Sequence, residues 1–142
     1  MVKRSVGTQF QSVTAQTLDL TIFPNLVGLT ANGAFNQCEN MTRLMLPASL
    51  TEVFQSLFGN YSVGKTVIIG NATEGSSLNT IRWHAFYYAT VVLYATTPPA
   101  TIETQSGATW YVPDDSLDLY LAYKAAHSNL NMTFKPISEW PG

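Results

Sequence analysis

Pairs of apolar residues recur along this chain at a nearly constant interval. Two apolar residues separated by one other residue occur four times, and the interval of about 24 residues falls in the range that is typical of solenoids. Each pair suits a short strand that presents two side chains on one face. In a solenoid each repeat buries its apolar face against its neighbours. The four pairs are Leu20 with Ile22, Leu44 with Leu46, Val67 with Ile69, and Val91 with Leu93.

Phenylalanine follows the same period more loosely, through Phe10, Phe35, Phe58 and Phe86, with the longest step between the last two. Loops of variable length would absorb this variation while the strands stay in register. We therefore expect parallel stacked strands, with each Phe filling the core at a corner. The alternative is an ordinary β-rich domain with chance spacing. The predicted core consists of Leu20, Ile22, Phe35, Cys38, Leu44, Leu46, Phe58, Val67, Ile69, Phe86, Val91 and Leu93.

Five segments carry a resemblance to a known family. Residues 34–38 (AFNQC) and 41–53 (MTRLMLPASLTEV) resemble the "AFxGC…LTxIxIPxSVTxI" theme of the BspA-type leucine-rich repeat. Residues 93–99 (LYATTPP), 110–116 (WYVPDDS) and 134–137 (FKPI) are similar to the C-terminal segment of those proteins. The resemblance covers residues 18–137 and implies a leucine-rich-repeat-like β-solenoid of about four short repeats with a small C-terminal α/β cap.

One position departs from the family pattern. Asn36 and Gln37 stand where the family often has one residue and a glycine. The resemblance is specific for the fold and weak for function, because family members are mostly bacterial surface proteins and adhesins that bind through broad repeat surfaces.

The period divides the chain into three parts. Residues 1–17 are a polar N-terminal leader, which is either a partial first repeat or a docking arm. Residues 18–96 form the predicted solenoid. Residues 97–142 form the predicted cap, because the period stops after Leu93 and Pro98 and Pro99 cannot continue a central strand. In this cap we expect strands at 109–112 and 132–137. We also expect a helix that starts at residues 114–116, where Asp114, Asp115 and Ser116 supply the N-cap and an acidic first turn. One face of this helix would carry Leu117, Tyr120, Leu121 and Lys124.

Composition excludes some partners and locations. Charged residues make up 11% of the chain and the net charge is −2, without a basic patch, so we expect no nucleic-acid partner. No stretch approaches the roughly 18–20 apolar residues that span a bilayer. The segment after Lys3 and Arg4 is polar, so we expect no secretory signal peptide. A single cysteine, Cys38, excludes an internal disulfide.

One segment matches a phosphate-binding pattern. Residues 59–66 (GNYSVGKT) fit G-x-x-x-x-G-K-[ST]. That loop holds phosphate at the N-terminus of a following helix, whereas residues 67–69 continue as a strand in the repeat register. Nucleotide binding through this segment is therefore only a third hypothesis.

Other reactive residues lack a catalytic or metal-binding arrangement. His84 and His127 are not at metal-ligand spacing with Cys38 or a carboxylate, and Cys38 occupies a position that is buried in the resembling family. Asp114, Asp115 and Asp118 lack the spacing of a calcium loop, and helix capping accounts for them. We therefore predict a protein that is not an enzyme and has no catalytic site, metal or cofactor.

Contact residues are predicted on exposed loops. Aromatic and arginine side chains are common binding anchors, which selects Arg43, Arg82, Trp83, Tyr87 and Tyr88. One of the two tyrosines is expected to pack partly within the repeat. The polar insert 70–77 is a further contact candidate, because loops on one rim of a solenoid often carry binding.

These observations predict a non-enzymatic module that binds proteins or glycans. Short adhesin-like repeats without an export signal suggest a bacteriophage virion component, such as a head decoration, fibre or tail protein, made in the host cytoplasm. Such a protein would bind virion proteins or copies of itself, with a host surface glycan or protein as a further partner. The alternative is a bacterial cell-surface adhesin of the BspA-like type.

Overall fold

The described residues form two parallel β-sheets and one C-terminal α-helix. The computed structural model describes residues 4–7, 10, 13–59, 63–105 and 107–142. One sheet (sheet A) has the order β1-β3-β5-β7-β9 and the other (sheet B) has the order β11-β10-β8-β6-β4-β2. Their strands are β1 (Arg4–Val6), β3 (Leu26–Leu29), β5 (Glu52–Val53), β7 (Thr80–Ile81) and β9 (Thr101–Ile102), and β2 (Thr17–Asp19), β4 (Arg43–Leu46), β6 (Thr66–Ile69), β8 (Thr90–Leu93), β10 (Thr109–Val112) and β11 (Thr133–Pro136).

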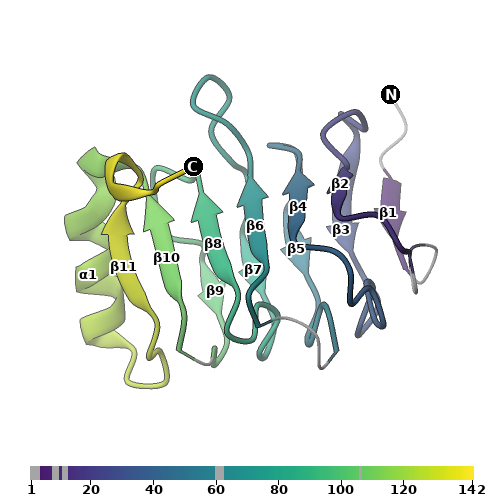
Figure 1. Ribbon diagram of the computed structural model, residues 1–142. Coiled ribbons are helices and arrows are strands. Elements are labelled where there is room, and N and C mark those ends of the chain that lie inside the picture. Colours follow the sequence, from purple (N-terminus) through teal and green to yellow (C-terminus); the bar gives the residue numbers. More distant parts are fainter. Residues whose placement is uncertain (1–3, 8–9, 11–12, 60–62, 106) are drawn as a thin grey trace.

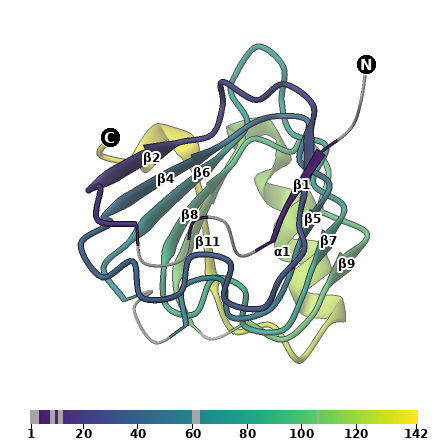
Figure 2. The ribbon, with the colours of Figure 1, turned by 90° about the vertical axis from the view of Figure 1, so that its right-hand side faces the viewer.

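From β1 to β10 the chain alternates between the two sheets, so successive strands of each sheet lie side by side and parallel (Figure 1). Figure 2, which looks along the stack from the β1 end, shows the sheets on opposite sides of each coil. This arrangement is solenoid-like, and the predicted short parallel strands are confirmed. Loops that leave sheet B lie on one rim (the upper rim, at the top of Figure 1), and loops that return to it lie on the other (the lower rim).

The second residues of the four predicted apolar pairs, Ile22, Leu46, Ile69 and Leu93, were expected to stack in one buried row, and three of the four do so. Leu46, Ile69 and Leu93 are in register across β4, β6 and β8, and their side chains have no exposed surface. They face the inner residues of sheet A, such as Val53, within one core cluster. Sheet register therefore accounts for the observed period.

Ile22 is a correction to the predicted core, because its side chain is 70% exposed. Leu18, rather than Leu20, pairs with Leu44, so the first step of the stack is longer than the spacing predicted and Leu20 corresponds to Leu46. The strand ends at Asp19, whose carboxylate accepts hydrogen bonds from the backbone N–H and hydroxyl of Thr21 and turns the chain outward. The other predicted core residues are buried.

A column of aromatic rings runs along the stack, as predicted. Phe35, Phe58 and Phe86 are fully buried at successive corners, and the rings of Phe35 and Phe58 have centroids 6.0 Å apart. Phe10 stacks on Phe35 at 6.1 Å, which places this part of the leader against the core. β1 also pairs with β3, so the described leader residues contribute to the first coil. Trp110 contacts Phe86 at 5.6 Å and extends the column.

The strands predicted at 109–112 and 132–137 are present as β10 and β11, and they continue the stack of sheet B beyond residue 96. Trp110 of β10 pairs with Val91 of β8 after a connection shorter than the usual repeat, and Phe134 of β11 then pairs with Trp110. The helix α1 (Leu117–Ala126) lies between β10 and β11 in sequence and at the end of the stack (Figure 1). Tyr120 is its buried residue, whereas Leu121, predicted on the same face, is 44% exposed.

The start of α1 also differs from the prediction. A 3₁₀ turn, η1 (Asp114–Ser116), precedes the helix, and no side-chain capping bond is made. Asp114 instead accepts a hydrogen bond from the backbone N–H of Ser138, which lies in the short 3₁₀ turn η2 (Ile137–Glu139). The Ser116 hydroxyl donates to the carbonyl of Thr96. Within the described residues, no helix has the length and apolarity that a membrane span requires.

Candidate functional site: an aromatic corner on the lower rim

Four rings gather on the loop that joins β7 to β8, on the lower rim. Trp83, Tyr87 and Tyr88 are 47%, 38% and 49% exposed. The Trp83 ring stacks on the His84 ring with centroids 3.9 Å apart, His84 lies 5.5 Å from Tyr87, and Tyr87 meets Tyr88 edge-on at 4.7 Å. We call these four residues the aromatic corner. It unites three of the five predicted contact residues.

The backbone conformation of this loop is the same as that of the corresponding corners in the preceding coils. The Phe35 N–H donates to the carbonyl of Leu57, and the Leu57 N–H donates to the carbonyl of Ala85. His84, like Ser56 and Gly33, has a positive φ immediately before an apolar-Phe pair. Tyr88 has φ +55°, and Gln37, at the equivalent place, has φ +61°. The corner geometry is therefore general in this fold.

The side chains that occupy this backbone conformation differ from corner to corner. Where this loop carries Tyr87 and Tyr88, the equivalent corner carries Asn36 and Gln37, and the next begins with Gly59. A left-handed backbone costs an L-residue roughly 1–2 kcal/mol, and large side chains rarely adopt it. The stack thus forms without aromatic residues at this place.

Polar contacts hold the loop rigid from within. The buried amide of Gln105 donates to the carbonyls of Arg82 (2.7 Å) and Glu103 (3.0 Å), and its oxygen accepts the N–H of Phe86 at 3.2 Å. The Trp83 N–H donates to the Glu103 carboxylate at 2.8 Å. Sequence reasoning missed Gln105, because two of its three partners, Arg82 and Phe86, lie on the neighbouring coil and no local pattern indicates burial.

Arg82 adjoins the corner but is engaged in ion pairs. Its guanidinium lies 2.9 Å from the Glu52 carboxylate and 3.6 Å from that of Glu103, and 6.0 Å from the Phe54 ring centroid. The two carboxylates come from the coils on either side, so the arginine bridges them across the outer face of sheet A. Its role is therefore to join coils, with its charge already compensated.

The fifth predicted contact residue, Arg43, lies elsewhere. It starts β4 and donates to the Gly142 carbonyl at 2.9 Å, with its guanidinium 5.7 Å from the centroid of the Trp140 ring. Because Leu44 and Leu46 face the core, Arg43 faces outward. The C-terminal end of the chain is thus held against the outer face of sheet B.

The lysine of the segment that matches the phosphate-binding pattern has a structural role. Lys65 is buried, and its ammonium donates to the carbonyls of Cys38 (2.8 Å) and Met41, 5.5 Å from the centroid of the Phe58 ring. Burial lowers the pKa of this ammonium. Thr66 begins β6, so a strand follows the segment as predicted. Residues 60–62 lie outside the described part of the chain.

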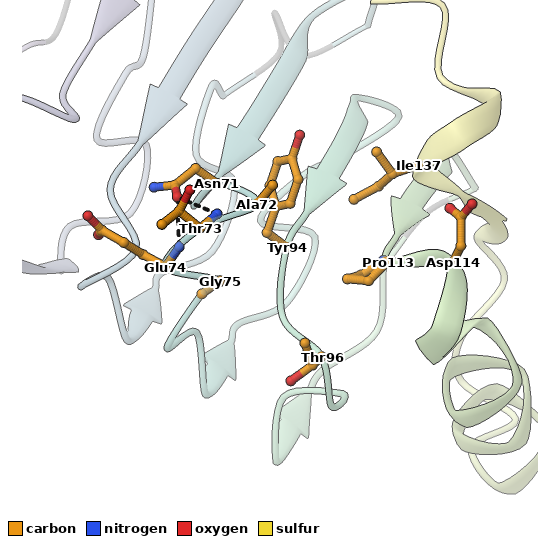
Figure 3. A pocket seen from close by; sticks show the side chains of 11 residues that line it. Asn71, Ala72, Thr73, Glu74, Gly75, Tyr94, Thr96, Pro113, Asp114 and Ile137 are labelled. Atoms are coloured by element: carbon orange, nitrogen blue, oxygen red, sulfur yellow. Dashed lines mark hydrogen bonds between the residues drawn. The ribbon is translucent and has the colours of Figure 1, made fainter.

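A second candidate is a pocket of about 490 Å³ on the upper rim (Figure 3). The insert 70–77 forms one wall, and Tyr94, Pro113, Asp114 and Ile137 contribute most of the rest. The insert closes on itself through the Asn71–Gly75 bridge. Two carboxylates, those of Glu74 and Asp114, and no basic residue line the pocket, so it favours cationic or hydroxyl-rich groups over anions.

The remaining reactive residues serve the fold. His127 Nδ1 lies 2.7 Å from the Tyr123 carbonyl oxygen, to which it donates, and the two rings stack at 4.0 Å. Cys38 Sγ donates to the carbonyl of Phe10. Across residues 4–7, 10, 13–59, 63–105 and 107–142, no three His, Cys, Asp or Glu side chains are grouped to hold a metal.

Comparison with protein-family models, with curated proteins and with solved structures finds no match to this chain.

Proposed function

We propose that this chain is a non-enzymatic interaction module that binds a protein or a glycan through the aromatic corner. The observation that supports this most directly is the contrast between equivalent corners, polar at Asn36 and Gln37 but doubly aromatic at Tyr87 and Tyr88. Exposed Trp and Tyr side chains on a rigid support are typical binding anchors.

We further propose that the fold is a short leucine-rich-repeat-like solenoid of the BspA type. Gln37 supports this: it stands where the family pattern has glycine, and its φ of +61° is a conformation that favours glycine. Ala34, Phe35 and Cys38, which match the family's "AFxGC" theme, are all fully buried. The solenoid-like stacking of parallel strands is also compatible with it.

The biological setting that we propose is a bacteriophage virion, in which the module serves attachment or assembly. Among the described residues, β1 and β2 are outermost in their sheets, so each presents an edge to which a strand from a larger assembly can add. The alternative setting is the surface of a bacterium. Mass spectrometry of purified particles and of cell-envelope fractions separates them: presence in envelopes and absence from particles would contradict the virion assignment.

The binding proposal is tested with paired arrays. Wild-type protein is applied to a protein array and a glycan array, and each hit is measured again with the double variant Tyr87→Asn/Tyr88→Gln, which copies the equivalent corner. We expect at least one hit whose affinity falls tenfold or more in the variant, about 1.4 kcal/mol. Hits whose affinity does not change would contradict binding at the aromatic corner. Nucleotide binding through residues 59–66 instead predicts an ATP-dependent rise in melting temperature.

A further inference from the structure

We infer that the ligand of the aromatic corner is a neutral saccharide, recognised by stacking of a sugar ring on the indole of Trp83. This inference rests on the proposed function and specifies its ligand. A pyranose presents a face of C–H groups that pack on an aromatic ring and a rim of hydroxyls that need hydrogen-bonding partners. The corner offers both kinds of surface within a few side chains.

The size of the exposed aromatic surface favours a small ligand unit. A large aromatic side chain has about 150–250 Å² of surface. At the exposures of Trp83, Tyr87 and Tyr88, the three residues present together about 200–330 Å². A stable protein interface takes about 800 Å² from each partner. Polar groups adjoin the rings, because the neighbouring side chains include the Glu103 carboxylate and the Asn131 amide.

Charge favours a neutral ligand over an acidic one. Arg82, the cation next to the corner in sequence, is paired with Glu52 and Glu103, which leaves this group of three with a net negative charge. A sulfated or sialylated glycan, like a nucleic acid, would need a cation that is available for pairing.

Polar groups suited to sugar hydroxyls surround the rings. Among the described residues, the phenolic hydroxyls of Tyr87 and Tyr88 make no hydrogen bond and so can donate and accept. Beside Tyr88 lies Gly107: a Cβ at this glycine would be 3.9 Å from Tyr88 Cε1 and 4.0 Å from Asn131 Oδ1. The exposed Tyr88 ring and the exposed Asn131 side chain therefore both lie beside Gly107, where one bound sugar can contact both.

The test uses an array that carries neutral, sialylated and sulfated glycans, followed by titration of the strongest neutral oligosaccharide. Trp83 is exposed, Trp140 is partly exposed and Trp110 is fully buried, so comparing the fluorescence of Trp83→Phe and Trp140→Phe with wild type isolates stacking at Trp83. We expect a saturable emission change that Trp83→Phe removes and Trp140→Phe retains. Tyr87→Asn/Tyr88→Gln should weaken binding tenfold or more, and Gly107→Leu should weaken it by filling the space beside Tyr88.

The outcomes separate the two proposals. Preferential binding of sialylated or sulfated glycans would overturn the neutral class. If no glycan binds but a protein hit still loses affinity in Tyr87→Asn/Tyr88→Gln, the saccharide is wrong and the aromatic corner remains a binding site. If no ligand of either class depends on the corner, both proposals fail. Denaturant unfolding of each variant shows that a loss of binding does not reflect a loss of folding.

Discussion

Tyr88 and Gln37 occupy equivalent places at two corners of the stack, with φ angles of +55° and +61°. Both residues therefore adopt the same left-handed backbone conformation. Their side chains differ, because one is a 49% exposed aromatic ring and the other is a polar amide. Because the fold forms with a polar amide at the equivalent place, we infer that folding does not require the tyrosine. This comparison within one chain is the basis for assigning a binding role to the aromatic corner.

The left-handed backbone at Gln37 leads to a first prediction. Gln37→Gly should stabilise the protein by about 0.5–1 kcal/mol, because relief of the strained φ outweighs the greater flexibility of glycine in the unfolded chain. Gln37→Ala is the matched control: it also shortens the side chain but keeps the strain, so it should bring no gain. The free energy of unfolding in urea measures both, and equal effects of the two substitutions would contradict the strain argument.

The corrected register of the first coil leads to a second prediction. Leu20→Ala should cost about 2–5 kcal/mol, because Leu20 is buried in line with Leu46. Ile22→Ala should change stability by less than about 0.5 kcal/mol, because Ile22 is exposed. The comparison uses two aliphatic residues that are close together in the chain. Large losses at both positions would restore the register that the sequence alone suggested, in which both side chains are buried.

Lys65 provides a third prediction. Lys65→Met should destabilise the protein by about 1–3 kcal/mol, because the carbonyls of Cys38 and Met41 lose their donor. Lys135→Met, at an exposed position in β11, should change stability by less than about 0.5 kcal/mol. Thermal unfolding with and without ATP completes the experiment. An ATP-dependent rise in melting temperature that disappears in Lys65→Met would indicate nucleotide binding instead.

Asp114 provides a prediction about pH. Hydrogen bonds from the hydroxyl and the backbone N–H of Ser138 lower the pKa of this carboxyl below its ordinary value of 3.8. The folded state therefore prefers the carboxylate, and this stabilisation is present above pH 3.8 and is lost as the pH falls through the lowered pKa. Asp114→Asn should be less stable than wild type near neutral pH, and the difference should shrink in acid. A difference that is constant across that range would contradict the assignment.

The repeat period in the sequence predicted those core residues whose positions are fixed by the register of the parallel strands. Leu46, Ile69 and Leu93 were predictable because parallel strands stay aligned once one pair is in register. The turn at Asp19 accompanies a first step that is longer than the others, and a shorter connection brings Trp110 into line with Val91. Loop lengths of this kind follow from local hydrogen bonds that the spacing does not encode.

The candidate site was predictable in part for a related reason. Trp83, Tyr87 and Tyr88 lie close together in the sequence, so proximity along the chain indicated proximity in space. The pairing of Arg82 with Glu52 and Glu103 instead joins residues on neighbouring coils that are far apart in the sequence. The contact between Arg43 and the Trp140 ring depends on how the C-terminal end of the chain folds back. Neither long-range contact has a signature in a single sequence.

The most direct test of the account measures stability and ligand affinity together on Tyr87→Asn/Tyr88→Gln. Affinity is measured for the strongest hit from the arrays, and stability by urea unfolding. We predict an affinity at least tenfold weaker and a free energy of unfolding within about 1 kcal/mol of wild type, because the equivalent corner already folds with Asn and Gln. Unchanged affinity, or a collapse in stability that accounts for the lost binding, would show that the two tyrosines serve the fold and not a ligand.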